Sequence, residues 1–203
     1  MNKPNQLTVL RIILSPVVAV FILYSEIPHN WLLAGIFFGI AAITDALDGH
    51  LARSQGIITN FGKLMDPIAD KLLVISALIC FVKVGMCSPW IVIIILAREF
   101  LVTSIRMVSV ENGVVIPANV WGKVKTIIQI VAIVYVLVSR YFIYALKLIL
   151  KPNMYEHNLS ELLDPHLLLA GDVLLWLCAA ATVISGLIYI YESRELMKDA
   201  GKK

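Results

Sequence analysis

Long apolar runs alternate with short polar breaks along the whole chain. Hydrophobic residues make up 60% of the 203 residues, charged residues only 15%, and the mean hydropathy is +0.87. A helix of about 20 apolar residues is long enough to cross the hydrocarbon core of a bilayer. A chain of this length has room for roughly six such helices and little else. We therefore predict an all-α integral membrane protein, with a single transmembrane domain over residues 1–203 and six spans.

The polar breaks divide the chain into these six spans. Their approximate bounds are residues 5–24, 31–44, 66–84, 89–110, 121–144 and 167–191. The segment 141–166 mixes charged with apolar residues. It is compatible with a prolonged fifth helix followed by an interfacial loop, and its topology stays open.

Six spans place both termini on one side of the membrane, and the basic residues indicate which side. Thirteen Lys and Arg residues fall in the loops and helix ends on the side of the termini, and four fall on the opposite side. Because positive charge accumulates on the cytoplasmic side, the termini and the segment 45–70 are predicted to face the cytoplasm. The basic residues form no stripe that would indicate nucleic-acid binding. Anionic lipid headgroups and phosphate-bearing substrates are the expected partners.

The three cysteines, Cys80, Cys87 and Cys178, lie in apolar runs without metal-ligand spacing. We interpret them as small buried hydrophobic residues with no chemical role.

Four aspartates interrupt the apolar pattern between residues 45 and 70. Asp45 and Asp48 are three residues apart, and Asp66 and Asp70 are four apart, so on helices each pair lies on one face. Carboxylates at membrane depth are costly and usually mark a functional site. If the two helices are neighbours, the four oxygen ligands suit hard divalent cations, Mg²⁺ or Mn²⁺. Four carboxylates then suit two metal ions that bind the same phosphoryl group, in a polar metal-binding cavity at the cytoplasmic side.

Other residues of the same segment fit a phosphate-bearing ligand. Small residues at Gly49, Ala52 and Gly62 leave room near the backbone, and Arg53 offers a planar donor fork. Asp70, the last acid, is the candidate for accepting a proton from an attacking hydroxyl. Two alternatives remain: a structural ion network between helices, and a carrier of divalent cations, although carriers commonly place the site near the midplane between repeated halves.

The spacing of these residues resembles the signature of the CDP-alcohol phosphatidyltransferases. The matching positions are Asp45-x-x-Asp48-Gly49-x-x-Ala52-Arg53 and, after eight residues, Gly62-x-x-x-Asp66-x-x-x-Asp70. The resemblance implies a six-helix membrane enzyme that transfers a phosphatidyl group from a CDP-linked lipid to an alcohol and releases CMP. It further implies that the aspartates hold two divalent ions, that Asp70 is the general base, and that the enzyme is a homodimer.

Weaker motifs extend the resemblance over most of the chain, toward the branch that takes CDP-diacylglycerol and glycerol 3-phosphate. They are Pro4-Asn5-x-Leu7-Thr8-x-x-Arg11, Asp66-Pro67-x-Ala69-Asp70-Lys71, Ala97-Arg98-Glu99 and Gly122-Lys123-x-Lys125-Thr126. The predicted CDP-lipid ligands are Asn5, Thr8, Gly49, Ala52, Arg53 and Gly62. Arg11 either faces a phosphate or extends to the membrane interface.

Glycerol 3-phosphate is a dianion, so its pocket needs fixed positive charge. The candidates at the cytoplasmic edge of the fourth and fifth spans are Arg98, Arg106, Lys123 and Lys125. Flanking charge that only sets topology is the alternative for these residues, strongest for Lys125 and weakest for Arg98, which lies within an apolar helix. Another acceptor, such as inositol phosphate, serine or phosphatidylglycerol, would use the same aspartates with different basic residues.

Overall fold

The computed structural model describes residues 3–55, 60–111, 120–149 and 157–200. Side chains are described within these ranges for residues 8–44, 69, 71–109, 120–149 and 162–194. The described chain folds into six α-helices: α1 (Lys3–Leu23), α2 (Asn30–Gln55), α3 (Asn60–Lys83), α4 (Pro89–Glu111), α5 (Val120–Ile149) and α6 (His157–Ala200). The predicted all-α class and the predicted number of helices are therefore confirmed for the described residues.

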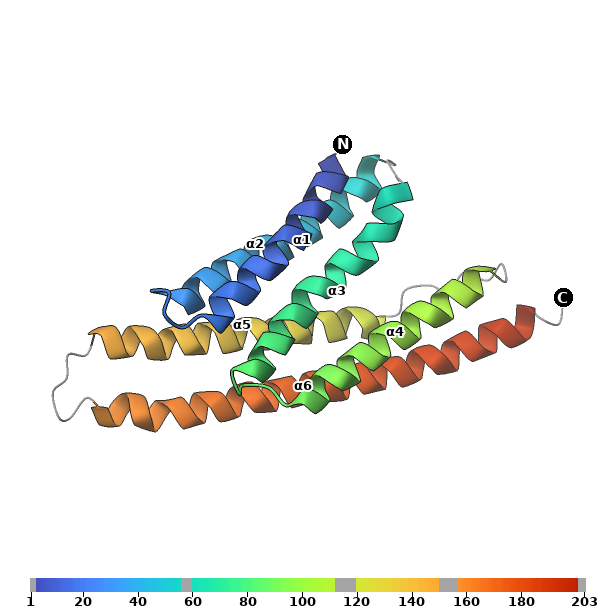
Figure 1. Cartoon of the computed structure of the whole chain (residues 1–203). Helices are drawn as coiled ribbons and strands as arrows, with labels where there is room; N and C mark the ends of the chain where they lie inside the picture. Colours follow the sequence, from blue (N-terminus) through green and yellow to red (C-terminus); the bar gives the residue numbers. More distant parts are fainter. Residues whose placement is uncertain (1–2, 56–59, 112–119, 150–156, 201–203) are drawn as a thin grey trace.

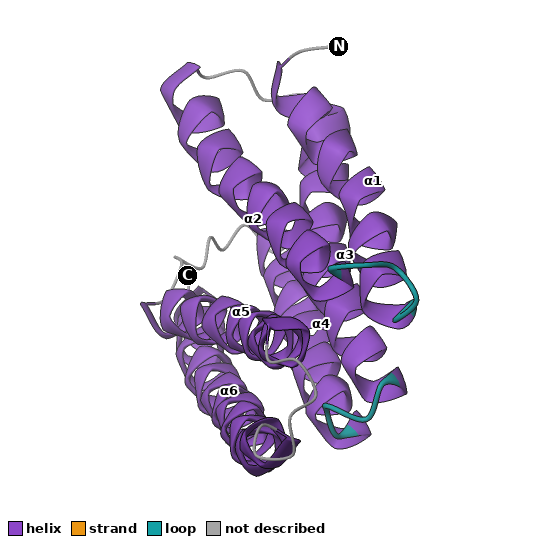
Figure 2. Cartoon of the chain, turned by 90° about the vertical axis from the view of Figure 1, so that its left-hand side faces the viewer, coloured by secondary structure: helices purple, strands orange, loops and turns teal. Residues whose placement is uncertain are grey.

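The helices form two groups that cross one another (Figures 1 and 2). α1 packs against both α2 and α3. α6 packs against both α4 and α5, and contacts of α2 with α5 and of α3 with α4 join the two groups. The buried core along these contacts is apolar, and its largest side chains include Phe38, Phe81 and Leu78.

The outer surface of the molecule is apolar as well. Each helix leaves large hydrophobic side chains exposed, among them Ile13, Ile36, Ile79, Phe100, Val131 and Trp176. A soluble protein rarely exposes so much contiguous apolar surface, whereas lipid tails cover such a surface without penalty. Within the described residues, the segments 120–149 and 162–194 are long and apolar enough to cross a membrane, and shorter apolar stretches occupy 8–23 and 30–44.

Two helix boundaries differ from the predicted spans. α3 begins at Asn60, about two turns before the predicted start, so Pro67 lies inside the helix and not in its first turn. Neighbouring helices make an internal proline tolerable in transmembrane helices. α5 extends to Ile149, as a prolonged fifth helix predicts, and α6 already begins at His157, so the predicted interfacial loop is much shorter.

The cysteines are buried, as predicted, and form no disulfide bond. Cys87 lies between α3 and α4, where burial raises the pKa of its thiol to about 12, with a smaller contribution from Asp172. Because the thiolate is the reactive form, such a thiol is inert near neutral pH.

Candidate active site

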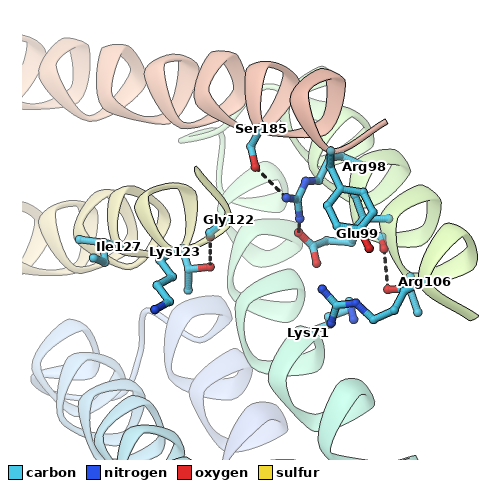
Figure 3. A pocket seen from close by; sticks show the side chains of 12 residues that line it. Lys71, Arg98, Glu99, Arg106, Gly122, Lys123, Ile127 and Ser185 are labelled. Carbon is cyan, nitrogen blue, oxygen red and sulfur yellow. Dashed lines mark hydrogen bonds and ion pairs between the residues drawn. The ribbon is translucent and has the colours of Figure 1, made fainter. Parts of the chain in front are cut away.

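A pocket of about 470 Å³ lies where α3, α4, α5 and α6 meet (Figure 3). Three of the four predicted phosphate ligands, Arg98, Arg106 and Lys123, line it together. The remaining lining residues are Lys71, Glu99, Val102, Thr103, Gly122, Thr126, Ile127, Ser185 and Tyr189. Residues from distant parts of the chain thus form one strongly basic pocket.

Arg98 is held in place from two sides. Its Nη1 donates to Oε1 of Glu99 at 3.1 Å, and its Nη2 donates to Oγ of Ser185 on α6 at 2.8 Å (Figure 3). The stem of Arg98 passes directly over Gly186, where an added Cβ would lie 3.0 Å from the Arg98 Cγ. These contacts restrict the rotamers of Arg98 and position its planar guanidinium at the wall of the pocket.

Glu99 also joins α4 to α5. Its Oε1 accepts a hydrogen bond from Nζ of Lys125, and the side chains of both residues are largely buried. Lys125 lines a separate, smaller space of about 50 Å³ and does not line the basic pocket. The fourth predicted phosphate ligand is therefore engaged in an ion pair within the protein.

The charge of the pocket is strongly unbalanced. Lys71, Arg98, Arg106 and Lys123 contribute four cations, and Glu99 contributes the only carboxylate among the described lining residues. Arg106 and Lys123 are exposed and can reach a ligand that enters from solvent. This excess of positive charge suits a multiply charged anion such as a phosphate monoester.

The pocket gathers corresponding ends of the helices. It lies near the start of α5 and along the second halves of α4 and α6, and Lys71 contributes to it from the middle of α3. If successive helices cross a membrane in opposite directions, the start of α5 and the final parts of α4 and α6 lie at the same face of the membrane.

Sequence reasoning missed three lining residues of interest, namely Lys71, Ser185 and Tyr189. For Lys71 a signal existed, since it directly follows Asp70 in the predicted motif. Ser185 and Tyr189 lie in an apolar helix where no sequence pattern distinguishes them from ordinary packing residues.

The aspartate motif lies on α2 and α3, and of these two helices α3 contributes Lys71 to the pocket. Asp45 and Asp48 are on α2, Asp66 and Asp70 are on α3, and the two helices contact one another. The four side chains lie outside the described ones, and so do those of Asn5, Gly49, Ala52, Arg53 and Gly62. Among the described side chains, no cluster of three or more metal-ligating residues occurs. The predicted metal and CDP-lipid ligands therefore stay predictions.

Two polar residues of α1 have described side chains. Thr8 is 1% exposed and Arg11 is 2% exposed. An arginine that extends to the membrane interface would be exposed at its head, so the burial argues against this alternative for Arg11, and its role toward a phosphate stays a prediction.

Comparison with known proteins places the chain among enzymes. A model of the CDP-alcohol phosphatidyltransferases matches residues 1–184. The chain is 37% identical over 209 residues to the CDP-diacylglycerol–glycerol-3-phosphate 3-phosphatidyltransferase of Bacillus subtilis (strain 168), covering 97% of each chain. It is 35% identical over 188 residues to the enzyme of the same name from Rickettsia bellii (strain RML369-C), covering 93% of each. A probable phosphatidylglycerophosphate synthase from Mycobacterium tuberculosis (strain ATCC 25618 / H37Rv) is 43% identical over 134 residues, covering 65% of this chain and 64% of that protein. The chain belongs to the CDP-alcohol phosphatidyltransferase family.

Proposed function

We propose that this enzyme transfers the phosphatidyl group of CDP-diacylglycerol to glycerol 3-phosphate, which gives phosphatidylglycerophosphate and CMP. The observation that carries the proposal is the basic pocket next to the aspartate motif. Lys71 lines the pocket and is the chain neighbour of Asp70, so a ligand in the pocket lies close to the motif on α3. The names of relatives that match nearly the whole chain support the same reaction.

The acceptor binds with its phosphate among Arg98, Arg106 and Lys123. Arg98 presents a guanidinium already oriented by Glu99 and Ser185, so little side-chain entropy is lost on binding. Arg106 and Lys123 add charge from the two flanking helices. A neutral acceptor such as serine would leave this positive charge uncompensated, so the pocket favours an anionic acceptor. Lys125 does not contact the acceptor. It holds Glu99, which in turn orients Arg98.

Enzymes of this family generally use divalent cations. The donor set fits such ions: Asp45 and Asp48 lie on one face of α2, Asp66 and Asp70 lie on one face of α3, and all four supply oxygen ligands. These residues would hold two Mg²⁺ or Mn²⁺ ions. When bound, these ions would neutralise negative charge on the pyrophosphate of the CDP-lipid and on the CMP leaving group.

Asp70 accepts the proton of the acceptor's terminal hydroxyl, whose oxygen attacks the phosphorus that bears the diacylglycerol. The new phosphorus–oxygen bond forms as the bond to CMP breaks. Asn5, Thr8, Gly49, Ala52, Arg53 and Gly62 bind the CDP-lipid. The lipid tails stay in the bilayer, in contact with the exposed apolar faces of the helices.

The six helices cross the cell membrane, and the basic pocket faces the cytoplasm, where the soluble substrate is present. The exposed apolar side chains on every helix support this multi-pass arrangement. The protein is also proposed to form a homodimer, as the resemblance to its family implies.

The test is CMP release by the purified protein in detergent–lipid micelles with CDP-diacylglycerol. We expect release that requires glycerol 3-phosphate and stops when a chelator removes divalent cations. Asp70→Asn is expected to remain folded and to bind the CDP-lipid, with turnover at least a hundredfold lower because the proton acceptor is lost. Near-normal turnover of this variant would rule out Asp70 as the base.

The same assay separates the rival functions. Faster CMP release with inositol phosphate, serine or phosphatidylglycerol would reassign the acceptor and leave the reaction class intact. If the protein moved Mn²⁺ into liposomes and released no CMP with any acceptor, it would be a cation carrier and the proposed function would be wrong.

A further inference from the structure

One hydroxyl in the basic pocket is buried and has no hydrogen-bond partner among the described residues. It belongs to Tyr189 on α6, a residue only 3% exposed. The other hydroxyls that line the pocket are all engaged. Thr103 donates to the carbonyl of Glu99 at 2.7 Å, Thr126 donates to the carbonyl of Gly122 at 3.0 Å, and Ser185 accepts from Arg98 at 2.8 Å. Tyr189 is therefore the exception among the pocket's described hydroxyls.

Packing holds the ring of Tyr189 in position. It forms a small apolar cluster with Val102 of α4, against which Ile105 also packs. This packing and the low exposure of the residue keep the hydroxyl away from bulk water. Leaving a buried hydroxyl without a partner is costly, so such a group calls for an explanation.

A second donor in the same pocket is also unsatisfied. The Nε of Arg98 is buried without a hydrogen-bond partner, whereas its two terminal nitrogens bind Glu99 and Ser185. Two donors from two helices thus lack an acceptor in a pocket rich in cations. A phosphate supplies only acceptors and carries the complementary charge.

We propose that Tyr189 is a specificity-determining residue, whose hydroxyl donates a hydrogen bond to the phosphate of the acceptor. The proposal rests on the proposed function and adds a neutral donor to the predicted cations. Positive charge alone attracts any anion. A hydroxyl held in a fixed position selects a ligand that places a phosphate oxygen within hydrogen-bond distance of it. Binding requires a small side-chain shift that uncovers this hydroxyl, and the exposed Arg106 lines the same pocket.

The experiment compares wild-type protein with Tyr189→Phe, which keeps the ring that packs on Val102 and removes only the hydroxyl. The matched control is Tyr191→Phe on the same helix, since Tyr191 is 67% exposed and does not line the pocket. Calorimetric titration measures the affinity for glycerol 3-phosphate and for inorganic phosphate, and an acceptor titration of CMP release measures KM and kcat.

In Tyr189→Phe we expect roughly tenfold weaker binding of both phosphate ligands, because a hydrogen bond to a charged group contributes about that factor. KM for glycerol 3-phosphate rises similarly, kcat changes less than twofold, and Tyr191→Phe matches wild type. Unchanged affinities in Tyr189→Phe would overturn the proposal. So would weaker glycerol 3-phosphate binding with unchanged inorganic phosphate binding, because the hydroxyl would then contact the glycerol.

Failure of the proposed function gives a different pattern. If the wild-type protein releases no CMP with glycerol 3-phosphate, the proposed reaction is wrong. The two binding titrations still decide whether Tyr189 recognises phosphate.

Discussion

At Gly186 the backbone of α6 approaches Arg98 so closely that an added methyl group would require the arginine stem to shift. An added Cβ would lie 3.0 Å from the Arg98 Cγ, tighter than ordinary van der Waals contact. Gly186→Ala is therefore expected to push the arginine stem away and to weaken its bond to Ser185. We predict a roughly fivefold to tenfold higher KM for glycerol 3-phosphate, because one charged hydrogen bond is impaired. An acceptor titration of CMP release measures this effect.

Gly35→Ala is the control for this substitution. Gly35 also lies within a helix, but no described atom lies within 4 Å of the position that its Cβ would occupy. Alanine stabilises a helix relative to glycine, so this variant should keep its KM and unfold at the same or a slightly higher temperature. An equal rise of KM in both variants would mean that the close approach to Arg98 is not the cause.

The surroundings of Lys123 and Lys125 show what a sequence can and cannot predict at this scale. Both were predicted phosphate ligands, yet one lines the basic pocket and the other pairs with Glu99. Residues two apart on a helix point in different directions, so this separation was available from the spacing. The grouping of Ser185 and Tyr189 with Arg98 was not available, because it depends on how α6 packs against α4.

At the scale of elements, the ion pair of Glu99 with Lys125 links α4 to α5. The two side chains are 16% and 6% exposed, so water compensates poorly for a lost partner. Lys125→Met leaves the carboxylate hydrogen bonded to Arg98, with Lys71 as a further cation in the pocket. We predict a loss of about 3 kcal/mol in the free energy of unfolding, the usual cost of breaking a buried pair. Denaturant unfolding in detergent micelles, followed by circular dichroism, measures it.

Lys147→Met on the same helix is the control, because Lys147 is exposed. Its effect should stay within about 0.5 kcal/mol. Adding Glu99→Gln to Lys125→Met should recover part of the lost stability, since the unpaired charge is removed. Additive losses in this double variant would mean that the two residues do not interact across the helices.

The existence of each helix could be predicted from its apolar run, whereas some boundaries could not. Hydropathy marks where a helix meets lipid, but a helix continues wherever its backbone stays hydrogen bonded. α3 thus starts at Asn60 and α6 continues to Ala200, beyond the apolar segments that the sequence outlines. The extension of α3 carries Gly62 of the predicted motif, whereas Lys71, Ser185 and Tyr189 of the basic pocket lie within the predicted spans.

At the scale of the whole molecule, the prediction of six spans requires that successive helices cross the membrane in opposite directions. If each helix crosses the membrane once, the turn between α1 and α2 faces outward and the end of α6 faces inward. Glu26 and Arg194 are exposed at these two places. The native cysteines are buried, so they should react slowly with thiol reagents and can be replaced by alanine. Single cysteines at positions 26 and 194 then report the side of the membrane.

We predict that a membrane-impermeant maleimide labels Glu26→Cys in intact cells, and labels Arg194→Cys only after the membrane is permeabilised. The reason is that the excess of Lys and Arg lies on the side of the termini and holds that side in the cytoplasm. Labelling of both variants after permeabilisation is the control for thiol reactivity. The reverse pattern in intact cells would place the basic pocket outside, away from cytoplasmic glycerol 3-phosphate. Labelling of both positions in intact cells would mean an even number of crossings between them instead of the five of α2 to α6, so at least one of these helices would not span the membrane.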